Sequence, residues 1–432
     1  ALWEVKKVYQ PIRFSLEHRN QQQLTISNEL HFTTLDDFEF VWVLTTDGIE
    51  TSKGSLENIN AGPSESQQRS IPYPTLDLSK ENILTISAYS KTEKNLVPAK
   101  HEIAWEQFVL NSPTLAKNVP TTTDIAINEL SNSVEISSKE LTLILDKSTG
   151  IITGLYYGDK PNMIANKNGF TPNFWRAPID NDFGNDFHKR CKDWRFVSKH
   201  RRVANIETAK ADGKVILKVD FDLFTENNEK LATFSTKYTI NGSGTMLIEN
   251  DLVLLKETFP EIPRIGLNLQ LTDDYDQISW YGRGPHESYW DRKTGAKIHR
   301  YTGTVAEQYW AYIRPQENGN KEDTRWVSLT NKKGDGLVIR GLPTFNVSAH
   351  HQLMEDFESM ERTDGRHRDG DIVRNRHTID VLRRPLVSLN IDYRQMGVGG
   401  DTSWGAHTHE AYKLTENKYH YAFLLSPFST NK

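Results

Sequence analysis

The stretch KVILKVDFDLFTENNEKLATFSTKYTINGSGTMLIENDLVLL, residues 214–255, decides the fold class of this chain. Apolar side chains alternate with mostly polar ones, beginning with Val215, Leu217 and Val219, and this is the period of a half-buried strand. Two short polar segments, ENNEK and NGSG, interrupt the alternation. Because a parallel crossover needs a dozen or more residues, such short connections predict antiparallel neighbours. The stretch therefore predicts three antiparallel strands.

The same alternation recurs along most of the chain, whereas helical periodicity is scarce. The segment ELTLILDKSTGIITGLYY predicts another hairpin, with its turn at Lys147–Gly150. Helical spacing is limited to residues 189–199 and 304–311. The histidines of AHH, at 349–351, are expected at the end of a strand rather than around a metal. The pattern as a whole predicts a mainly β protein.

A break in composition divides the chain of 432 residues, which is too long for one ordinary core. The segment NSPTLAKNVPTTTD, residues 111–124, has two prolines, four threonines and little apolar periodicity. The strands before it have the length and spacing of an immunoglobulin-like sandwich. No comparable break follows it. We therefore expect an all-β chain with an immunoglobulin-like β-sandwich at 1–112, a linker at 113–123 and one large β-sandwich at 124–432.

Charge and composition exclude several classes of protein. The net charge of -5 provides no basic stripe for a nucleic-acid backbone. No run of eighteen apolar residues is present that could span a membrane. The single cysteine, Cys191, excludes an internal disulfide framework. Aromatic residues make up 10% of the chain, which suits a protein that handles sugars, although a large β core also uses them.

Four segments break the alternation and combine glycine, proline, charged and aromatic residues, a composition typical of functional or tightly packed loops. They are FWRAPIDNDFGND (Phe174–Asp186), YGRGPHESYWDR (Tyr281–Arg292), RPQENGNKEDTRW (Arg314–Trp326) and GVGGDTSW (Gly397–Trp404). The glycines of the last segment permit a tight turn, which could direct Trp404 outward.

Metal, nucleotide and nucleophile sites find little support in these segments. Asp180 and Asp182 do not fit a calcium loop, because Gly184 stands at a ligand position and no glutamate closes the ring. We expect Arg176 and these acids to form a buried hydrogen-bonded network instead. The glycines of YGRGPHESYWDR lack dinucleotide-site spacing, so ion pairing is favoured there. Serine-nucleophile and zinc motifs are absent from the sequence.

The four segments resemble, in sequence and in order, the C-terminal region of the large glycoside hydrolase family 2 β-galactosidases. The opening ALWEVKKVYQPI is similar to the segment through which those enzymes leave their catalytic barrel. The resemblance covers nearly the whole chain. It implies the second immunoglobulin-like domain of such an enzyme, followed by its C-terminal β-supersandwich, which is of the galactose mutarotase type.

The resemblance also implies a function, the hydrolysis of terminal non-reducing β-galactosides such as lactose by a retaining glycosidase. Its two catalytic glutamates lie on a TIM barrel that this chain lacks, so no catalytic residue is expected here and the chain alone is expected to be inactive. The family's magnesium and sodium sites lie mostly on the same barrel, so no metal or cofactor is expected either. The implied partners are a galactoside, the upstream barrel of the same polypeptide and further copies in a homo-oligomer. The compartment is left open, either the cytoplasm or the periplasm of a bacterium.

The residue that the resemblance singles out is Trp404. In the family, a tryptophan of this glycine loop stacks on the sugar next to galactose, and an indole face packs well on sugar C–H bonds. Support for the loops near Trp404 is expected from nine further residues: Gly400, Asp401, Ser403, Arg176, Asp180, Asp182, Arg283, Glu287 and Asp291.

Two alternative functions use the same residues. A free-standing carbohydrate-binding module would employ the Trp404 loop without a partner barrel. An epimerase or lyase on the supersandwich fold would need a histidine with a carboxylate or tyrosine, for which His286 with Glu287 is the pair that the sequence offers.

Overall fold

The computed structural model describes residues 2–18, 22–94, 96–117, 119–120, 124–256, 259–358, 377–402 and 404–430. The chain divides into two compact units, one formed by residues 1–114 and 294–300 and the other by residues 115–293 and 301–432. Strands dominate both units, which confirms the expected all-β class.

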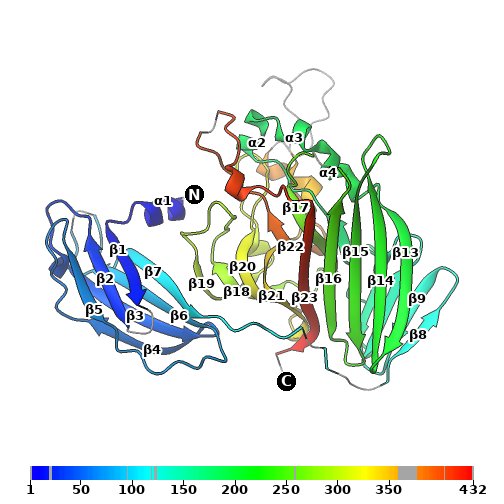
Figure 1. The fold of residues 1–432 in the computed structure, drawn as a ribbon, viewed down its shortest axis with the longest axis horizontal. Coiled ribbons are helices and arrows are strands. Elements are labelled where there is room, and N and C mark those ends of the chain that lie inside the picture. The colour runs from blue at the N-terminus through cyan, green and yellow to red at the C-terminus, as the bar shows by residue number, and fades with distance from the viewer. Residues whose placement is uncertain are drawn as a thin grey trace. The chain divides into compact units, whose positions relative to one another are not determined.

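The first unit is a β-sandwich, drawn in blue to cyan in Figure 1. Its N-terminal helix is α1 (Leu2–Val8). One sheet has the order β1 (Ile12–His18), β2 (Gln23–Asn28) and β5 (Ser66–Ser70). The other has the order β4 (Ile49–Leu56), β3 (Phe38–Thr46), β6 (Asn82–Ser90) and β7 (Glu102–Asn111). Ile26, Trp42 and Ile86 belong to the apolar core of this unit, as expected for an immunoglobulin-like sandwich.

The first unit also includes residues 294–300, a return of the chain that no sequence pattern indicated. The side chain of Gln107 accepts a hydrogen bond from the backbone N–H of Ile298 at 2.7 Å and donates to its carbonyl at 3.1 Å. Lys297 forms an ion pair with Glu102 at 2.6 Å. Polar side chains of β7 therefore hold this segment, in which β19 (Lys297–Thr304) begins.

In the second unit, the stretch 214–255 forms the three antiparallel strands that the sequence predicts (Figure 1, green). They are β14 (Lys214–Phe224), β15 (Lys230–Asn241) and β16 (Met246–Leu254), and β13 (Arg202–Ala211) extends the sheet beyond β14. Along β14 every second side chain is buried, beginning with Val215 and Leu217. The period-two pattern was therefore sufficient to predict strands, pairing and orientation.

The same large sheet continues through strands from later in the sequence. Beyond β16 come β23 (Lys418–Ser429), β21 (Asp335–His350), β22 (Leu386–Gln395), β17 (Arg264–Thr272) and β12 (Thr171–Asn173), while β20 (Lys321–Thr330) pairs with β21 and with β18 (Gln277–Gly284). A smaller sheet has the order β11 (Ile151–Tyr157), β10 (Leu141–Asp146), β9 (Ser133–Ser137) and β8 (Ala126–Glu129). The β10–β11 hairpin turns at 147–150, and β21 ends at His350, as predicted.

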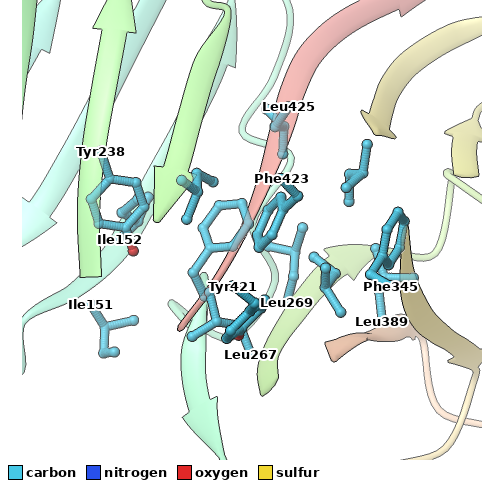
Figure 2. Packing of buried hydrophobic residues seen from close by; sticks show 14 of the residues in the cluster. Ile151, Ile152, Tyr238, Leu267, Leu269, Phe345, Leu389, Tyr421, Phe423 and Leu425 are labelled. Atoms are coloured by element: carbon cyan, nitrogen blue, oxygen red, sulfur yellow. The ribbon is translucent and has the colours of Figure 1, made fainter. Parts of the chain in front are cut away.

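The core of the second unit lies against one face of the large sheet (Figure 2). Leu267 of β17, Leu389 of β22 and Phe423 of β23 are fully buried there, together with Ile152 of β11. Because side chains alternate across a strand, the residues between them face the other side of the sheet. On β17 and β22 those residues are polar.

Helices are few and short among the described residues. Besides α1, they are α2 (Asp180–Gly184), α3 (Phe187–Arg190), α4 (Lys192–Val197) and short 3-10 turns such as Ala306–Gln308. The expected helix at 189–199 is thus divided at Cys191, whose side chain is fully buried, and only one turn forms within 304–311. Within the described ranges, no helix is long and apolar enough to cross a membrane.

A buried polar network covers the second face of β17, β21 and β22. Arg264 of β17 donates to Glu317 at 3.1 Å and lies 3.2 Å from Asp392 of β22. Gln395 donates to Glu317 at 3.2 Å and to Asn320 at 3.0 Å. The segment QENGNKE, residues 316–322, is therefore largely buried against the sheet rather than exposed as a loop. Many of its polar side chains form hydrogen bonds there.

Burial perturbs the acid–base properties of this network. It raises the pKa of Asp392 to about 7 and that of Glu322 to about 8. It lowers the pKa of Lys321 to about 8 and that of His350 to about 3. In each case the charged form loses hydration that the neighbouring groups do not fully replace.

The raised pKa of Glu322 predicts a pH-dependent stability. Between about pH 5 and 8 the folded chain keeps a proton that the unfolded chain has released, so the free energy of unfolding is expected to fall as the pH rises through this range. Glu322→Gln, which stays neutral, is expected to flatten that fall. Urea unfolding at four pH values between these limits measures it, with the exposed Glu226→Gln as the control variant. An equally steep profile for Glu322→Gln would contradict the assignment.

Candidate functional site

The indole of Trp404 is exposed on the surface of the second unit. Its side chain is 91% exposed, whereas Trp175, Trp194 and Trp280 are almost completely buried in the same unit. The backbone N–H of Trp404 donates to the hydroxyl of Thr402 at 3.3 Å. Because exposing a large aromatic ring gives up the free energy of its burial, an isolated tryptophan in this position suggests a contact surface.

One arm of the Trp404 loop is fixed by a carboxylate from a distant segment. Asp291 accepts hydrogen bonds from the backbone N–H groups of Val398 at 3.0 Å and Gly399 at 2.7 Å. A Cβ atom at Gly397 would lie 2.8 Å from the carboxyl carbon of Asp291, so glycine is needed for this close approach. Thr408 donates to the carbonyl of Gly397 at 3.2 Å. Asp291, one of the residues expected near this loop, therefore contacts its backbone directly.

The other arm packs against α2 through backbone atoms. A Cβ atom at Gly405, which has φ +104°, would lie 2.5 Å from the carbonyl oxygen of Gly184. Asn185 donates to the carbonyl of Ala406 at 3.4 Å. Across the loop, a Cβ at Gly400 would come within 2.5 Å of that same Ala406 carbonyl. Only glycine therefore fits where the loop folds back on itself and meets α2.

Two further residues of the loop were expected to support Trp404. Asp401 is exposed and lies 2.8 Å from the Nε2 of His409, which closes the base of the loop. Ser403 lies outside the described residues.

The segment that carries α2 is held by a buried ion pair. Arg176 and Asp182 make two hydrogen bonds, Nη1 to Oδ2 at 2.5 Å and Nη2 to Oδ1 at 3.1 Å. The same Asp182 carboxylate accepts from the backbone N–H of Ile179 at 2.8 Å, and the guanidinium lies 4.6 Å from the ring of Phe187. Burial disfavours the charge of Arg176, but Asp182 beside it raises the pKa of the guanidinium above its usual value.

Asp180 occupies a different environment from Asp182, although only one residue separates them. Its side chain is 61% exposed and lies 3.4 Å from Arg314. Arg314 in turn lies over the ring of Phe183 in α2, with its guanidinium carbon 3.7 Å from the ring centre. The expected buried network of Arg176 and the acids therefore includes Asp182, whereas Asp180 joins α2 to the RPQENG segment at the surface.

Arg283 and Glu287 make their described contacts elsewhere. Arg283 pairs with Asp323 at 2.6 Å, and Glu287 pairs with Arg292 at 2.7 Å. The Glu287 carboxylate also accepts from the hydroxyl of Tyr312 and from the N–H of Gly319 at 2.9 Å. The carboxylate of Glu287, which the epimerase or lyase hypothesis would use as its acid, is therefore already held by these three partners. A role of Arg283 and Glu287 in supporting the Trp404 loop stays a prediction.

Within the part of the chain that the structure describes, no group of three or more histidine, cysteine, aspartate or glutamate side chains could hold a metal ion. The Trp404 loop offers an apolar ring, exposed backbone groups and one carboxylate.

The anchoring by Asp291 can be tested on the loop itself. Asp291→Ala removes the acceptor of two backbone N–H groups, so hydrogen exchange at Val398 and Gly399 is expected to become at least about tenfold faster. Mass spectrometry or NMR of the exchanging amides measures this rate. Asp401→Ala, which removes an exposed acid of the same loop, is the control. Unchanged exchange in Asp291→Ala would show that the loop is held by other contacts.

Comparison with known proteins gives two family matches. Residues 137–425 match the model described as "Beta galactosidase small chain", and residues 24–111 match "Beta-galactosidase, domain 4". A β-galactosidase of Priestia megaterium is 34% identical over 98% of this chain, and one of Psychromonas ingrahamii is 30% identical over 99% of it. This chain spans 39% and 40% of the lengths of those two proteins.

A comparison of structures finds distant likenesses. A galactose 1-epimerase of Lactobacillus acidophilus aligns with 71% of this chain and 99% of its own, at 8% identity and a TM-score of 0.40.

Proposed function

The chain belongs to the β-galactosidase small chain family, and on this premise we propose that it is the C-terminal portion of a β-galactosidase that hydrolyses terminal β-galactosides such as lactose. The observation that carries the proposal is the exposed indole of Trp404 on an anchored glycine loop, within a chain that aligns almost end to end with two β-galactosidases. In this proposal the chain supplies a binding wall and not the reacting groups.

The chemistry follows from what Trp404 can contribute. The C–H bonds of a pyranose carry partial positive charge and pack favourably on the face of an indole. Such a contact does not depend on the position of each hydroxyl, so it accepts different sugars next to the galactose unit. Trp404 would therefore bind the leaving-group sugar and orient the glycosidic bond.

The reacting groups are proposed to lie on the part of the enzyme that this chain lacks. A retaining glycosidase needs two carboxylates about 5–5.5 Å apart, one as nucleophile and one as acid and base. We place both, with the magnesium and sodium sites, on the upstream barrel. We also expect the intact enzyme to form a homo-oligomer.

An activity assay tests the proposal. The purified chain alone is expected to release no galactose from lactose or from nitrophenyl β-galactoside. Produced together with the catalytic remainder of the Priestia megaterium enzyme, it is expected to form an active complex. Hydrolysis by the chain alone would overturn the proposal, as would a Trp404→Ala complex with unaltered use of lactose.

A further inference from the structure

A cavity lies on the polar face of the large sheet, and no residue of the Trp404 loop lines it. It has a volume of about 220 Å³ and opens between β12, β17, β22 and the end of α4. At about 30 Å³ per water molecule this volume corresponds to about seven waters, which is the size of one sugar ring with its hydroxyls.

The floor of the cavity is a preorganised array of amides and hydroxyls. Asn268 donates to Ser388 at 3.0 Å and to Asn390 at 2.9 Å, and Asn173 donates to Asn390 at 3.1 Å. These bonds fix the side chains in place before any ligand arrives. A rigid polar floor is the arrangement that recognises a polyol at low entropic cost.

Several donors in the wall are left without an acceptor. Gln270 is 8% exposed, and its Oε1 accepts from Asn166, but its Nε2 has no acceptor within the described residues. Ser388 accepts from Asn268, and its own hydroxyl hydrogen has no acceptor in that same part of the chain. Among the described residues, the hydroxyl of Ser198 and the Nε of Arg201 also lack a partner, but both atoms are closed off from solvent. The donors that a ligand in the cavity can use are therefore those of Gln270 and Ser388, which line it.

The charges of the wall do not cancel. Arg195 pairs with Glu358, and Lys199 pairs with Glu355 at 3.1 Å. Arg201 donates to the backbone carbonyl of Ser198 but has no carboxylate partner among the described residues. Burial lowers the pKa of Arg201, and its guanidinium carbon lies 5.9 Å from the centre of the Phe221 ring. The wall therefore has one cation more than it has acids, and an anionic group would balance it.

We propose that this cavity binds one acidic monosaccharide unit, a pyranose that carries a carboxylate. The carboxylate lies against the Nη2 side of the Arg201 guanidinium, and the ring hydroxyls accept from Gln270 and Ser388. A neutral hexose would fill the space but leave the arginine unpaired, and a bare carboxylate would leave the amide floor unused. This binding goes beyond the proposed function and does not depend on Trp404.

Calorimetric titration of the complete chain with galacturonate, glucuronate, galactose and acetate tests the proposal. At least one uronate is expected to bind, with galactose and acetate at least about tenfold weaker, since galactose lacks the carboxylate that pairs with Arg201 and acetate lacks the hydroxyls that accept from Gln270 and Ser388. Equal affinity of galactose and both uronates, or no binding of either uronate, would overturn the proposal.

Variants locate the site. Arg201→Gln is expected to weaken uronate binding at least about tenfold while leaving galactose binding unchanged, and Gln270→Leu is expected to weaken both. Arg202→Gln changes the neighbouring arginine, which does not line the cavity, and is the matched control.

If Gln270→Leu fails to fold, Arg201→Gln alone decides the outcome. Trp404→Ala is expected to bind uronate normally, which separates this site from the proposed function. Full uronate affinity in Arg201→Gln would overturn the proposal.

Discussion

Trp404→Ala is expected to weaken the binding of the sugar next to galactose by about 1–3 kcal/mol in the complete enzyme, which is about 5- to 150-fold in affinity. The indole is 91% exposed, and no hydrogen bond from its side chain to another described residue holds it, so its removal takes away a contact surface without disturbing the core. The Michaelis constant for lactose and the inhibition constant of glucose as an acceptor analogue measure the loss.

Two variants frame this experiment. Trp404→Phe keeps a smaller aromatic face and is expected to retain part of the affinity. Phe32→Ala removes an aromatic ring that is equally exposed, at 97%, but lies in the first unit, and is expected to change nothing. An unchanged Michaelis constant for lactose in a folded Trp404→Ala enzyme would remove the indole from the binding site.

Asp182→Ala is expected to destabilise the second unit by about 3–5 kcal/mol, because it leaves the Arg176 guanidinium buried without its counter-charge. It also removes the acceptor of the Ile179 N–H at the start of α2. Chemical denaturation of the purified chain measures the change in free energy of unfolding.

The matched control is Asp180→Ala, in the same helix. Its ion pair with Arg314 is exposed and 3.4 Å long, so its loss is expected to cost less than about 1 kcal/mol. Replacing both members of the buried pair, as Arg176→Met with Asp182→Leu, is expected to cost less than Asp182→Ala alone, since no orphaned charge remains. Similar losses in Asp180→Ala and Asp182→Ala would contradict the assigned roles.

Much of the fold was predictable because it depends on a local pattern. The alternation in residues 214–255 determines which side chains face the core, and short turns leave only antiparallel pairing. The helix at 189–199 was predicted less well, since the buried side chain of Cys191 interrupts it for reasons of packing that no local spacing shows. Residues 294–300 joined the first unit through side chains of β7, which are distant in sequence.

The site shows the same division. Glycine content indicated a turn at Trp404, and the exposed indole agrees with an outward direction. Sequence spacing could not separate Asp182 from Asp180, because one turns into the protein and the other to the surface. The contacts of Asn185 and Gly184 with the loop were missed, since the Asn185 side-chain amide meets a backbone carbonyl and Gly184 meets Gly405 through backbone atoms, and neither contact leaves a pattern in the sequence beyond the glycines. The cavity with Gln270 and Arg201 gathers residues from separate strands and was likewise not foreseen.

The return of residues 294–300 to the first unit bears on how the protein can be dissected. The backbone passes from one unit to the other at 114/115, at 293/294 and again at 300/301, so after a cut in the proline-containing stretch residues 1–114 stay attached only through non-covalent contacts with residues 294–300. A gene truncated after residue 114 would encode a sandwich without residues 294–300. Gln107 would then lose its contact with Ile298, and Glu102 its contact with Lys297.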